Sequence, residues 1–471
     1  MTTVAPVARR VDVVEPGRTR GIPSATVAGL SVGLAIVAKG LQARISDPDL
    51  WWHLRAGQLI VARHSIPAGD PFSYTLPGHR WIAQEWLSEV LMRSVAAMGG
   101  LQGVIVWRAL MLCAAYALVA RMMVRARGSS LSTWALFGLS AFAGVQSWTE
   151  RPSVFSFLLF TVTLSLVYAR DRRIWWFVPI ALVWVNLHGM VLVGLGLVGL
   201  VSAVELLAGD RAWGRHAAGA TACALVAVLI NPYGPGAMMH ALSLVRTVRP
   251  FVTEWAPPSV TDPVHWLFFC LVAFTLVTLA RARPRWPDVA VAAAFAALGF
   301  MAVRNLPVAA IALGTVSARA LPPGRPSAGR VQPVVLLAVI AVFGVVIAGS
   351  VGPARSPSLP VAAVRALPGG DVRLFTRDAW AGFALYERHN VRVTFDTRVD
   401  FYGAEATRAY QRALAGLDGW RTELRCATHA LVADGDGLAS RLSRDPSWSV
   451  VLHDPTGATL FVARAPSPSC A

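Results

Sequence analysis

Apolar residues dominate most of this chain, and they occur in long runs separated by short segments rich in arginine, proline and glycine. A run of about 20 apolar residues is long enough for a helix to cross the hydrocarbon core of a bilayer. By this criterion the candidate spans are 22–45, 101–124, 131–148, 152–169, 174–188, 190–208, 217–231, 263–280, 287–303, 307–321 and 331–350. The pattern therefore predicts an all-α polytopic membrane domain of about 11 transmembrane helices.

The arginines between these runs predict the orientation. They recur at alternate connections, in the clusters Arg121/Arg125/Arg127, Arg170/Arg172/Arg173, Arg211/Arg215, Arg281/Arg283/Arg285 and Arg319/Arg325/Arg330. Cytoplasmic loops carry an excess of arginine and lysine, so we expect a cytoplasmic N-terminal arm at 1–21 and an outer C-terminus. The predicted orientation depends most on the short runs on either side of 186–189 and on the run 307–321. If one of them did not span the membrane, every later segment would have the opposite orientation.

Two long connections fall on the outer side in this topology. The first, 46–100, contains a segment with opposed helical faces, apolar at Leu87, Val90, Leu91 and Met98 and polar at Glu85, Glu89 and Arg93. This spacing predicts an amphipathic helix at the membrane interface. The second outer connection, 232–262, is rich in proline and tryptophan.

From about residue 351 the composition becomes that of a soluble domain. Strand-like runs at 372–376, 391–395, 430–433, 448–453 and 458–463 alternate with helix-like segments at 380–388, 403–417 and 437–443. This alternation predicts a small α/β domain. The expected organisation is a transmembrane domain at 22–350 and an extracytoplasmic α/β domain at 351–471. Cys426 and Cys470 can form a disulfide in such a location.

Composition and charge narrow the function classes. The 471 residues are 55% hydrophobic and carry a net charge of +17. Basic proteins often bind nucleic acid, but these arginines lie where the positive-inside rule puts them, so we expect no nucleic-acid partner. The first run lacks a signal-peptidase site and reads as a retained helix. Abundant arginine and alanine indicate a GC-rich bacterial genome, and we expect a multi-pass protein of the bacterial inner (cytoplasmic) membrane.

Motifs of several soluble enzyme classes are missing or misplaced. The segment 194–199 fits GxGxxG, but it lies inside an apolar run, which indicates close helix packing. The histidines have no zinc-site spacing, and the sequence contains no P-loop lysine motif. The candidate chemistry therefore lies at the ends of the apolar runs.

Asp47 and Asp49 follow directly after the first run, at the polar surface of the membrane. Such a pair can hold a divalent cation, Mg²⁺ or Mn²⁺, against a phosphate, or one carboxylate can act as general base while the other orients it. Aspartate and proline are also common in turns. Trp51, Trp52 and His53 come next, and the tryptophans suit either an aromatic belt or a surface for stacking sugar rings.

Other polar residues at run ends fall on the same outer side. They are Glu150, Arg151, His188, Asn231, Glu254 and Arg304. We expect them to form one site with the two aspartates, although each could simply meet water where a run ends. Arg304, and Arg108 about two turns inside the second run, can bind a phosphate bidentately. Arg108 can equally pair with an acid from a loop.

Longer motifs connect these residues. The chain contains DPDLWWHLRAGQLI, IPAGDPFSYT and EWL, then WVNLHG, NPYG, EW and RNLP, and finally WAGFALYERHNVRVTFDTRVDFYG. This set resembles the GT-C superfamily of polytopic glycosyltransferases, which includes oligosaccharyltransferases and protein O-mannosyltransferases. It is more closely similar to a group of bacterial membrane proteins classed as GT-C-like, and the resemblance covers most of the chain from residue 47.

The resemblance implies a reaction and roles for the candidate residues. It implies transfer of a sugar from a polyprenyl-phosphate-linked donor to an extracytoplasmic glycan, lipid or protein acceptor, by an enzyme surrounded by membrane lipid. Asp47 would be the acid that activates the acceptor, Asp49 its partner and Glu150 a further catalytic acid, while Arg304 would contact the donor phosphate. The expected substrate-binding residues also include Trp51, Trp52, His53, Arg108, Arg151, His188, Asn231 and Glu254.

The tail departs from the oligosaccharyltransferase pattern because it lacks the WWDYG-type motif. Transfer to asparagine is therefore not supported. The tail carries Asp396, Thr397, Arg398 and Asp400 instead, which suit either an acceptor-glycan contact or a salt-bridged turn. Two other functions fit the same outline, namely a transporter or flippase of a lipid-linked saccharide and a non-catalytic partner in cell-envelope polysaccharide assembly.

Overall fold

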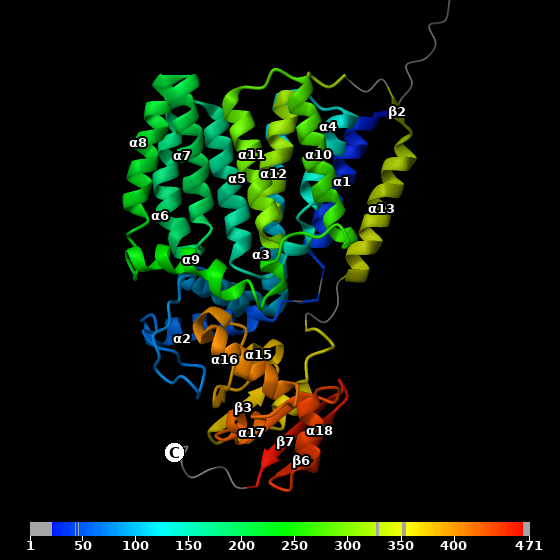
Figure 1. Ribbon diagram of the computed structural model, residues 1–471. Coiled ribbons are helices and arrows are strands. Elements are labelled where there is room, and N and C mark those ends of the chain that lie inside the picture. The colour runs from blue at the N-terminus through cyan, green and yellow to red at the C-terminus, as the bar shows by residue number, and fades with distance from the viewer. Residues whose placement is uncertain (1–20, 43, 46, 326–328, 351–354, 465–471) are drawn as a thin grey trace, which may run out of the picture.

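The computed structural model describes residues 21–42, 44–45, 47–325, 329–350 and 355–464. A bundle of long helices forms one part of the molecule, and a small domain with a β-sheet lies below one end of it (Figure 1). Almost all of the predicted arm at 1–21 lies outside the described residues.

Each predicted apolar run contains a helix. The bundle helices are α1 (Ser24–Gly40), α3 (Trp86–Arg127), α4 (Leu131–Phe142), α5 (Ser153–Ala169), α6 (Phe177–Leu187), α7 (Val191–Ala208), α8 (Arg211–Ala227), α10 (Trp266–Arg281), α11 (Trp286–Met301), α12 (Leu306–Ala320) and α13 (Pro333–Ser350). By length and composition, 3 helices among the described residues could cross a membrane, namely Trp86–Arg127, Val191–Ala208 and Pro263–Arg281. The number of spans therefore stays a prediction.

The outer surface of the bundle is apolar. Large hydrophobic side chains are exposed on α8, α10 and α13, among them Val226, Leu276, Leu337 and Val345. A soluble monomer rarely exposes this much contiguous apolar surface, and contact with lipid removes the cost. The helical bundle and its surface are those of a membrane protein.

The arginine-rich connections meet at one end of the bundle. Arg170, before α6, and Arg285, before α11, both pair with Glu205 of α7. At the same end, Arg319 of α12 pairs with Asp288. The short strands β1 (Ile22–Pro23) and β2 (Arg330–Val331) pair there as well. The sheet domain lies at the opposite end (Figure 1), as the predicted alternation requires; which end faces the cytoplasm stays a prediction.

The outer connections contain helices of their own. α2 (Asp49–Arg63) follows the first aspartate, and α3 joins the predicted interfacial helix to the second run across Gly100. Gly100 has φ +60°, a conformation open to glycine but strained for other residues. The polar face of the interfacial helix turns into the protein, because Glu89 is buried. The second connection, expected only as a loop, contains α9 (Pro235–Val248), which lies across the end of the bundle.

The C-terminal domain has the predicted strands and helices. The sheet order is β4-β3-β5-β7-β6, with β3 parallel to β4 and β5 and with β7 antiparallel to β5 and β6. The elements are α14 (Val361–Arg365), β3 (Val372–Thr376), α15 (Asp378–Glu387), β4 (Val391–Val393), α16 (Val399–Leu414), α17 (Trp420–Leu424), β5 (His429–Ala433), α18 (Gly437–Arg444), β6 (Trp448–Asp454) and β7 (Ala458–Ala463). Cys426 is disulfide-bonded, and Cys470 lies outside the described residues.

The C-terminal domain docks on α2 through α15. The ring of Trp51 lies 5.1 Å from that of Phe383 and 5.4 Å from that of Tyr386, measured between centroids, and only 1% of Trp51 is exposed. Gly382 allows the close approach, because a Cβ there would lie 3.1 Å from the carbonyl oxygen of Pro48. This position corrects the predicted substrate or belt role of Trp51, whose ring joins two domains instead.

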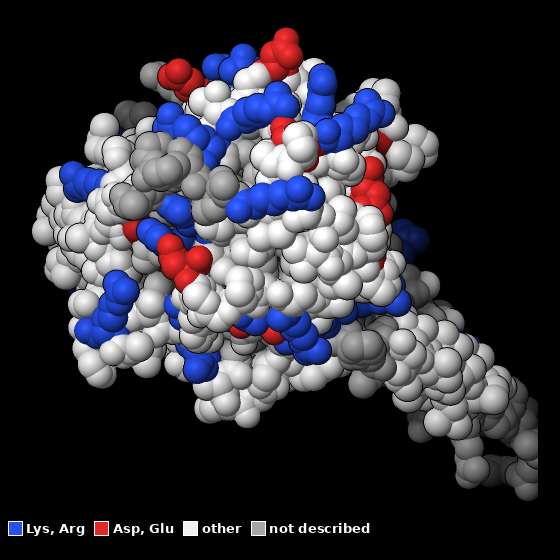
Figure 2. Space-filling model, turned by 90° about the horizontal axis from the view of Figure 1, so that it is seen from below, with Lys and Arg blue, Asp and Glu red and all other residues white. Residues whose placement is uncertain are grey.

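The first outer connection also covers the edge strand of the sheet. The backbone N–H of Val393 in β4 donates to the carbonyl of Phe72 at 2.9 Å, and that of Tyr74 donates to the carbonyl of Val393 at 3.1 Å. An exposed edge strand would otherwise offer free backbone groups to other chains. Seen from this end, arginines and acids are interspersed over the face of the molecule (Figure 2).

We expect Trp51→Ala to loosen the docked domain. Removing a buried aromatic side chain costs about 3–5 kcal/mol through lost packing and a residual cavity. Purified protein should unfold at a lower temperature, and protease should cleave within 355–464 faster than in wild type. Val450→Ala, at an exposed position of β6, is the control, and equal protease resistance of the Trp51 variant and the control would contradict the docking role.

Candidate functional site

A cavity of about 740 Å³ lies between the end of the bundle and the C-terminal domain. One wall comes from the start of α2, the segment before α3 and the connections that precede α5 and α12. The other wall comes from the C-terminal domain, at the turn that precedes α16. Eight predicted site residues line this cavity, namely Asp47, Asp49, Trp52, His53, Arg151, His188, Glu254 and Arg304.

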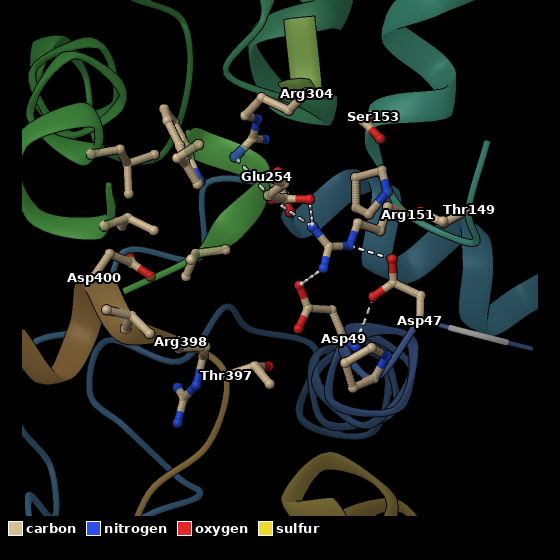
Figure 3. Close-up of a pocket in the computed structure, with 18 of the residues that line it drawn as sticks. Asp47, Asp49, Thr149, Arg151, Ser153, Glu254, Arg304, Thr397, Arg398 and Asp400 are labelled. Carbon is tan, nitrogen blue, oxygen red and sulfur yellow. Dashed lines mark hydrogen bonds and ion pairs between the residues drawn. The ribbon is translucent and has the colours of Figure 1, made fainter. Parts of the chain in front are cut away.

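Arg151 lies at the centre of an ion cluster in this cavity (Figure 3). Its guanidinium contacts Asp47 and lies 2.8 Å from a carboxylate oxygen of Asp49 and 2.8 Å from one of Glu254. The acids come from the turn into α2 and from the short helix η3 (Thr253–Trp255). Because one guanidinium faces three carboxylates, the cluster needs either further positive charge or a bound proton.

The two aspartates have different surroundings. Asp47 accepts a hydrogen bond from the backbone N–H of Asp49 at 3.0 Å, in a turn that begins α2, while its other oxygen contacts Arg151. Asp49 pairs with Arg151 through Oδ2, and its Oδ1 is buried without a hydrogen bond among the described residues. Burial raises the pKa of Asp49 to about 6, although the Arg151 charge opposes this shift. Thr397 points toward Asp49 from the C-terminal domain (Figure 3).

Arg304 approaches the cluster from the short helix η5 (Val303–Asn305). Its guanidinium lies over the ring of Trp255, 4.1 Å from the centroid, and its Nη1 lies 3.5 Å from Glu254. The ring holds the guanidinium in place. Among the described residues this long contact is its one ion pair, so most of its N–H groups remain for a ligand such as a phosphate.

Glu85, which directly precedes α3, is another acid on the cavity wall. Its carboxyl oxygens lie 3.2 Å from Nε2 of His188 and 3.6 Å from Nε2 of His53. On their far sides, His188 Nδ1 lies 2.9 Å from Ser156 Oγ and His53 Nδ1 lies 3.3 Å from Glu89 Oε1. Burial raises the pKa of Glu85 to about 8 and lowers that of His188 to about 3. Both groups are therefore stabilised in their uncharged forms.

Buried polar atoms without partners concentrate on this cavity. Such atoms are ordinarily hydrogen-bonded to protein, water or ligand. Among the described residues, unpartnered atoms on the cavity include Asp49 (Oδ1), Trp52 (Nε1), Gln84 (Nε2), Glu89 (Oε2), Gln146 (Oε1 and Nε2), Thr397 (Oγ1) and Arg398 (Nη1). Donors and acceptors both occur among them, which suits a ligand that carries hydroxyl and phosphate oxygens.

The tail cluster at 396–400 contains the predicted salt-bridged turn. Arg398 is buried, and its Nη2 lies 2.9 Å from Asp70 and 2.7 Å from Asp396. This salt-bridged turn therefore joins the first outer connection to the C-terminal domain. Thr397 and Asp400 also line the cavity, and the acceptor-glycan contact of this cluster stays a prediction.

Arg108 and Glu150 lie outside the cavity, in the buried interior of the bundle. They pair with each other, and the guanidinium of Arg108 also donates to the carbonyls of Gly40 at 2.8 Å and Gln42 at 2.7 Å. The predicted catalytic role of Glu150 and phosphate-binding role of Arg108 are corrected by this placement. The alternative, a pair between Arg108 and a loop acid, is what the structure has.

Asn231 also lies outside the main cavity. Its amide donates to the carbonyls of Val228 at 2.8 Å and Gly234 at 2.9 Å, and its Oδ1 accepts from the backbone N–H of Tyr233. These bonds hold the turn that leads into α9. Its predicted substrate contact is therefore corrected to a structural one.

Several cavity residues were missed in the sequence. Glu85 was placed only on the polar face of a helix, although it begins the EWL motif, and Gln84 and Gln146 carried no signal. His240 of α9 pairs with Asp400 at 3.3 Å, a contact between segments far apart in the chain. A sequence pattern cannot reveal such a contact.

The expected divalent cation finds no ready site. No group of three or more His, Cys, Asp or Glu side chains in the described part of the chain is arranged to hold a metal ion. Asp47 and Asp49 both direct oxygens at Arg151, whose guanidinium lies between them. Mg²⁺ and Mn²⁺ need several oxygen ligands around one point, and binding of a cation by these residues stays a prediction.

Solved structures share this architecture. ArnT from Cupriavidus metallidurans, in the apo state and bound to undecaprenyl phosphate, is 15% identical with a TM-score of 0.56, covering 95% of this chain and 98% of ArnT. The apo Archaeoglobus fulgidus oligosaccharyltransferase is 12% identical with a TM-score of 0.61, covering 93% of this chain and 74% of that enzyme. The chain has the GT-C fold. No protein-family model and no curated protein sequence matches it.

The structural role of the Arg108–Glu150 pair can be tested by mutation. We expect Glu150→Gln to destabilise the protein, because breaking a buried pair leaves an uncompensated charge at a cost of about 3–5 kcal/mol. Thermal unfolding should show this loss, and the double change Arg108→Met with Glu150→Met should recover part of it. If Glu150→Gln had normal stability but no sugar transfer, Glu150 would have a catalytic role after all.

Proposed function

We propose that this protein is an integral-membrane glycosyltransferase that moves a sugar from a polyprenyl-phosphate-linked donor to an extracytoplasmic acceptor. The observation that carries the proposal is the cavity at the end of the bundle, where the Arg151 cluster and Arg304 face a wall of unpartnered polar atoms. Two neighbours in fold support it, because one binds undecaprenyl phosphate and the other is an oligosaccharyltransferase, also solved with a tethered acceptor peptide.

Arg304 is our candidate for the donor phosphate. It has spare N–H donors and is held against Trp255. When the sugar leaves, the phosphate gains negative charge, and a fixed guanidinium stabilises that charge without reorganisation. The lipid tail would then lie along the apolar bundle, and the cavity would face the outer side of a bacterial inner membrane.

The aspartates would activate the acceptor. In an inverting displacement, the acceptor oxygen forms a bond to the anomeric carbon as the bond from that carbon to the phosphate oxygen breaks. The acceptor proton passes to a carboxylate. Asp49 suits this role best because its Oδ1 is unpartnered on the cavity, whereas both oxygens of Asp47 are engaged. Asp47 would then position Arg151 and the turn that carries Asp49.

Arg151 would take the place of a divalent cation. It neutralises the two aspartates and Glu254 and keeps them around the cavity. The charge that a metal ion would supply is thus built into the chain. The acceptor hydroxyl could belong to a glycan, a lipid or a protein.

We expect Asp49→Asn to lower transfer of labelled sugar from polyprenyl phosphate by about 100-fold or more, the usual effect of losing a general base. In wild type the rate should rise with pH through about 6, because the ionised form of Asp49 is the active one, and the variant should lack this step. Membranes with endogenous acceptor supply the assay. Asp371→Asn, at a surface ion pair of the C-terminal domain, is the control, and an Asp49→Asn rate equal to that of this control would contradict the assignment.

We expect metal chelation to leave the transfer rate unchanged, because Arg151 supplies the positive charge. Arg151→Gln should lower the rate by about 100-fold or more through the loss of fixed electrostatic stabilisation. The measurement is transfer in the presence of EDTA, with and without added Mg²⁺ or Mn²⁺. Loss of transfer in EDTA with recovery on addition of either cation would show that Asp47 and Asp49 hold a metal ion.

A further inference from the structure

Glu85 differs from the acids of the Arg151 cluster in what lies beside it. Those acids all contact a guanidinium, whereas the ion-pair neighbours of Glu85 among the described residues are His53 and His188. Its carboxyl nonetheless lies on the same cavity, with a quarter of the side chain exposed. Of the side chains within ion-pair distance, only a charged imidazole would compensate a carboxylate in this position.

His188 is held in its neutral form by its other contacts. The backbone N–H of Met190 donates to His188 Nδ1 at 3.3 Å. Ser156 accepts a hydrogen bond from Trp184 Nε1 at 2.7 Å, which leaves its own hydroxyl hydrogen for Nδ1 at 2.9 Å. A charged imidazole would turn an N–H toward these donors. His188 therefore carries its proton on Nε2, which lies 3.2 Å from a carboxyl oxygen of Glu85.

The charged form of the His53 imidazole is also unfavourable. It is buried against Trp52, with ring centroids 3.6 Å apart, and burial lowers its pKa well below the usual range. The nearby charges of Arg151 and Arg398 act in the same direction. Because both neighbouring imidazoles are neutral, the protonated form of the Glu85 carboxyl is favoured.

The charged groups around Glu85 do not cancel this effect. Burial is the largest influence on its pKa, which lies at about 8. Arg304 and Arg151 favour the ionised form, while Asp49 and Asp400 oppose it. On its own helix, Glu89 lies one turn away and also pairs with His53. At neutral pH the protonated form therefore prevails.

We propose that Glu85 is a phosphate-binding residue that donates a hydrogen bond from its protonated carboxyl to the lipid-linked donor, beside Arg304. The proposal rests on the proposed function for the identity of the ligand. A protonated carboxyl adds a donor without adding charge, and its bond to a phosphate oxygen is charge-assisted. No proton is transferred. The same residue in its ionised form would repel the phosphate.

The consequence is a pH dependence of donor binding with a defined sign. Below about pH 8 the carboxyl is protonated and binding is strong; above it the carboxyl ionises and binding weakens. If only the protonated form binds, the affinity falls about tenfold for each pH unit above the pKa. Glu85→Gln keeps a neutral donor at every pH and should remove this dependence.

The test uses the full-length protein in detergent and undecaprenyl phosphate as the probe. Affinity is measured from neutral to alkaline pH for wild type and Glu85→Gln, so that ionisation of the lipid phosphate itself is common to both. We expect equal affinities near neutral pH and about tenfold weaker binding by wild type one unit above the pKa. Glu423→Gln, a change of an acid outside the cavity whose pKa burial also raises, should follow wild type.

The outcomes separate this proposal from the proposed function. Parallel pH profiles for wild type and Glu85→Gln, or loss of binding in Glu85→Gln at neutral pH, would overturn the role of Glu85 while leaving the donor assignment intact. Absence of binding by wild type at every pH would overturn the donor assignment itself. Infrared difference spectra between wild type and Glu85→Gln provide a further check, because they should contain the carbonyl band of a protonated carboxyl that is lost above about pH 8, and absence of this band at neutral pH would refute the protonated form.

Discussion

The ion cluster around Arg151 is the interaction on which the site depends. This guanidinium pairs with Asp47 and Asp49 at the turn into α2 and with Glu254 in the second outer connection. These two segments are far apart in the sequence. Buried carboxylates at this density would repel each other and favour their protonated forms without a counter-charge. Arg151 therefore permits the acids to share one cavity, and it also determines which of their oxygens remain free.

The cavity divides its acids into two environments. Asp47, Asp49 and Glu254 lie against a guanidinium, while Glu85 lies against two imidazoles. Environments that separate the pKa values of neighbouring acids are a common basis for distinct roles in one site. One acid can then accept a proton from an acceptor while another keeps its proton in contact with a phosphate.

The C-terminal domain completes this arrangement by closing one wall of the cavity. Trp51 fixes α15 against α2, and Arg398 connects the domain to Asp70 of the first outer connection. These contacts bring Thr397 and Asp400 to the same cavity as the aspartates of α2. The cavity therefore depends on the docking of the two domains. If the contacts of Trp51 and Arg398 weakened, Thr397 and Asp400 would move away from the aspartates.

The sequence by itself determined the elements and their order. Apolar length predicted every bundle helix, and the alternation of strand and helix patterns predicted the sheet domain, because both signals depend on local periodicity. The run ends also identified Asp47, Asp49, Arg151, Glu254 and Arg304 as one outer group, since alternate connections must lie on the same side. Only the tertiary structure decided which charges meet. It paired Arg108 with Glu150 in the interior, buried Trp51 between domains and brought Glu85 to the cavity, because the neighbours of a side chain are set by packing between segments that are distant in the chain.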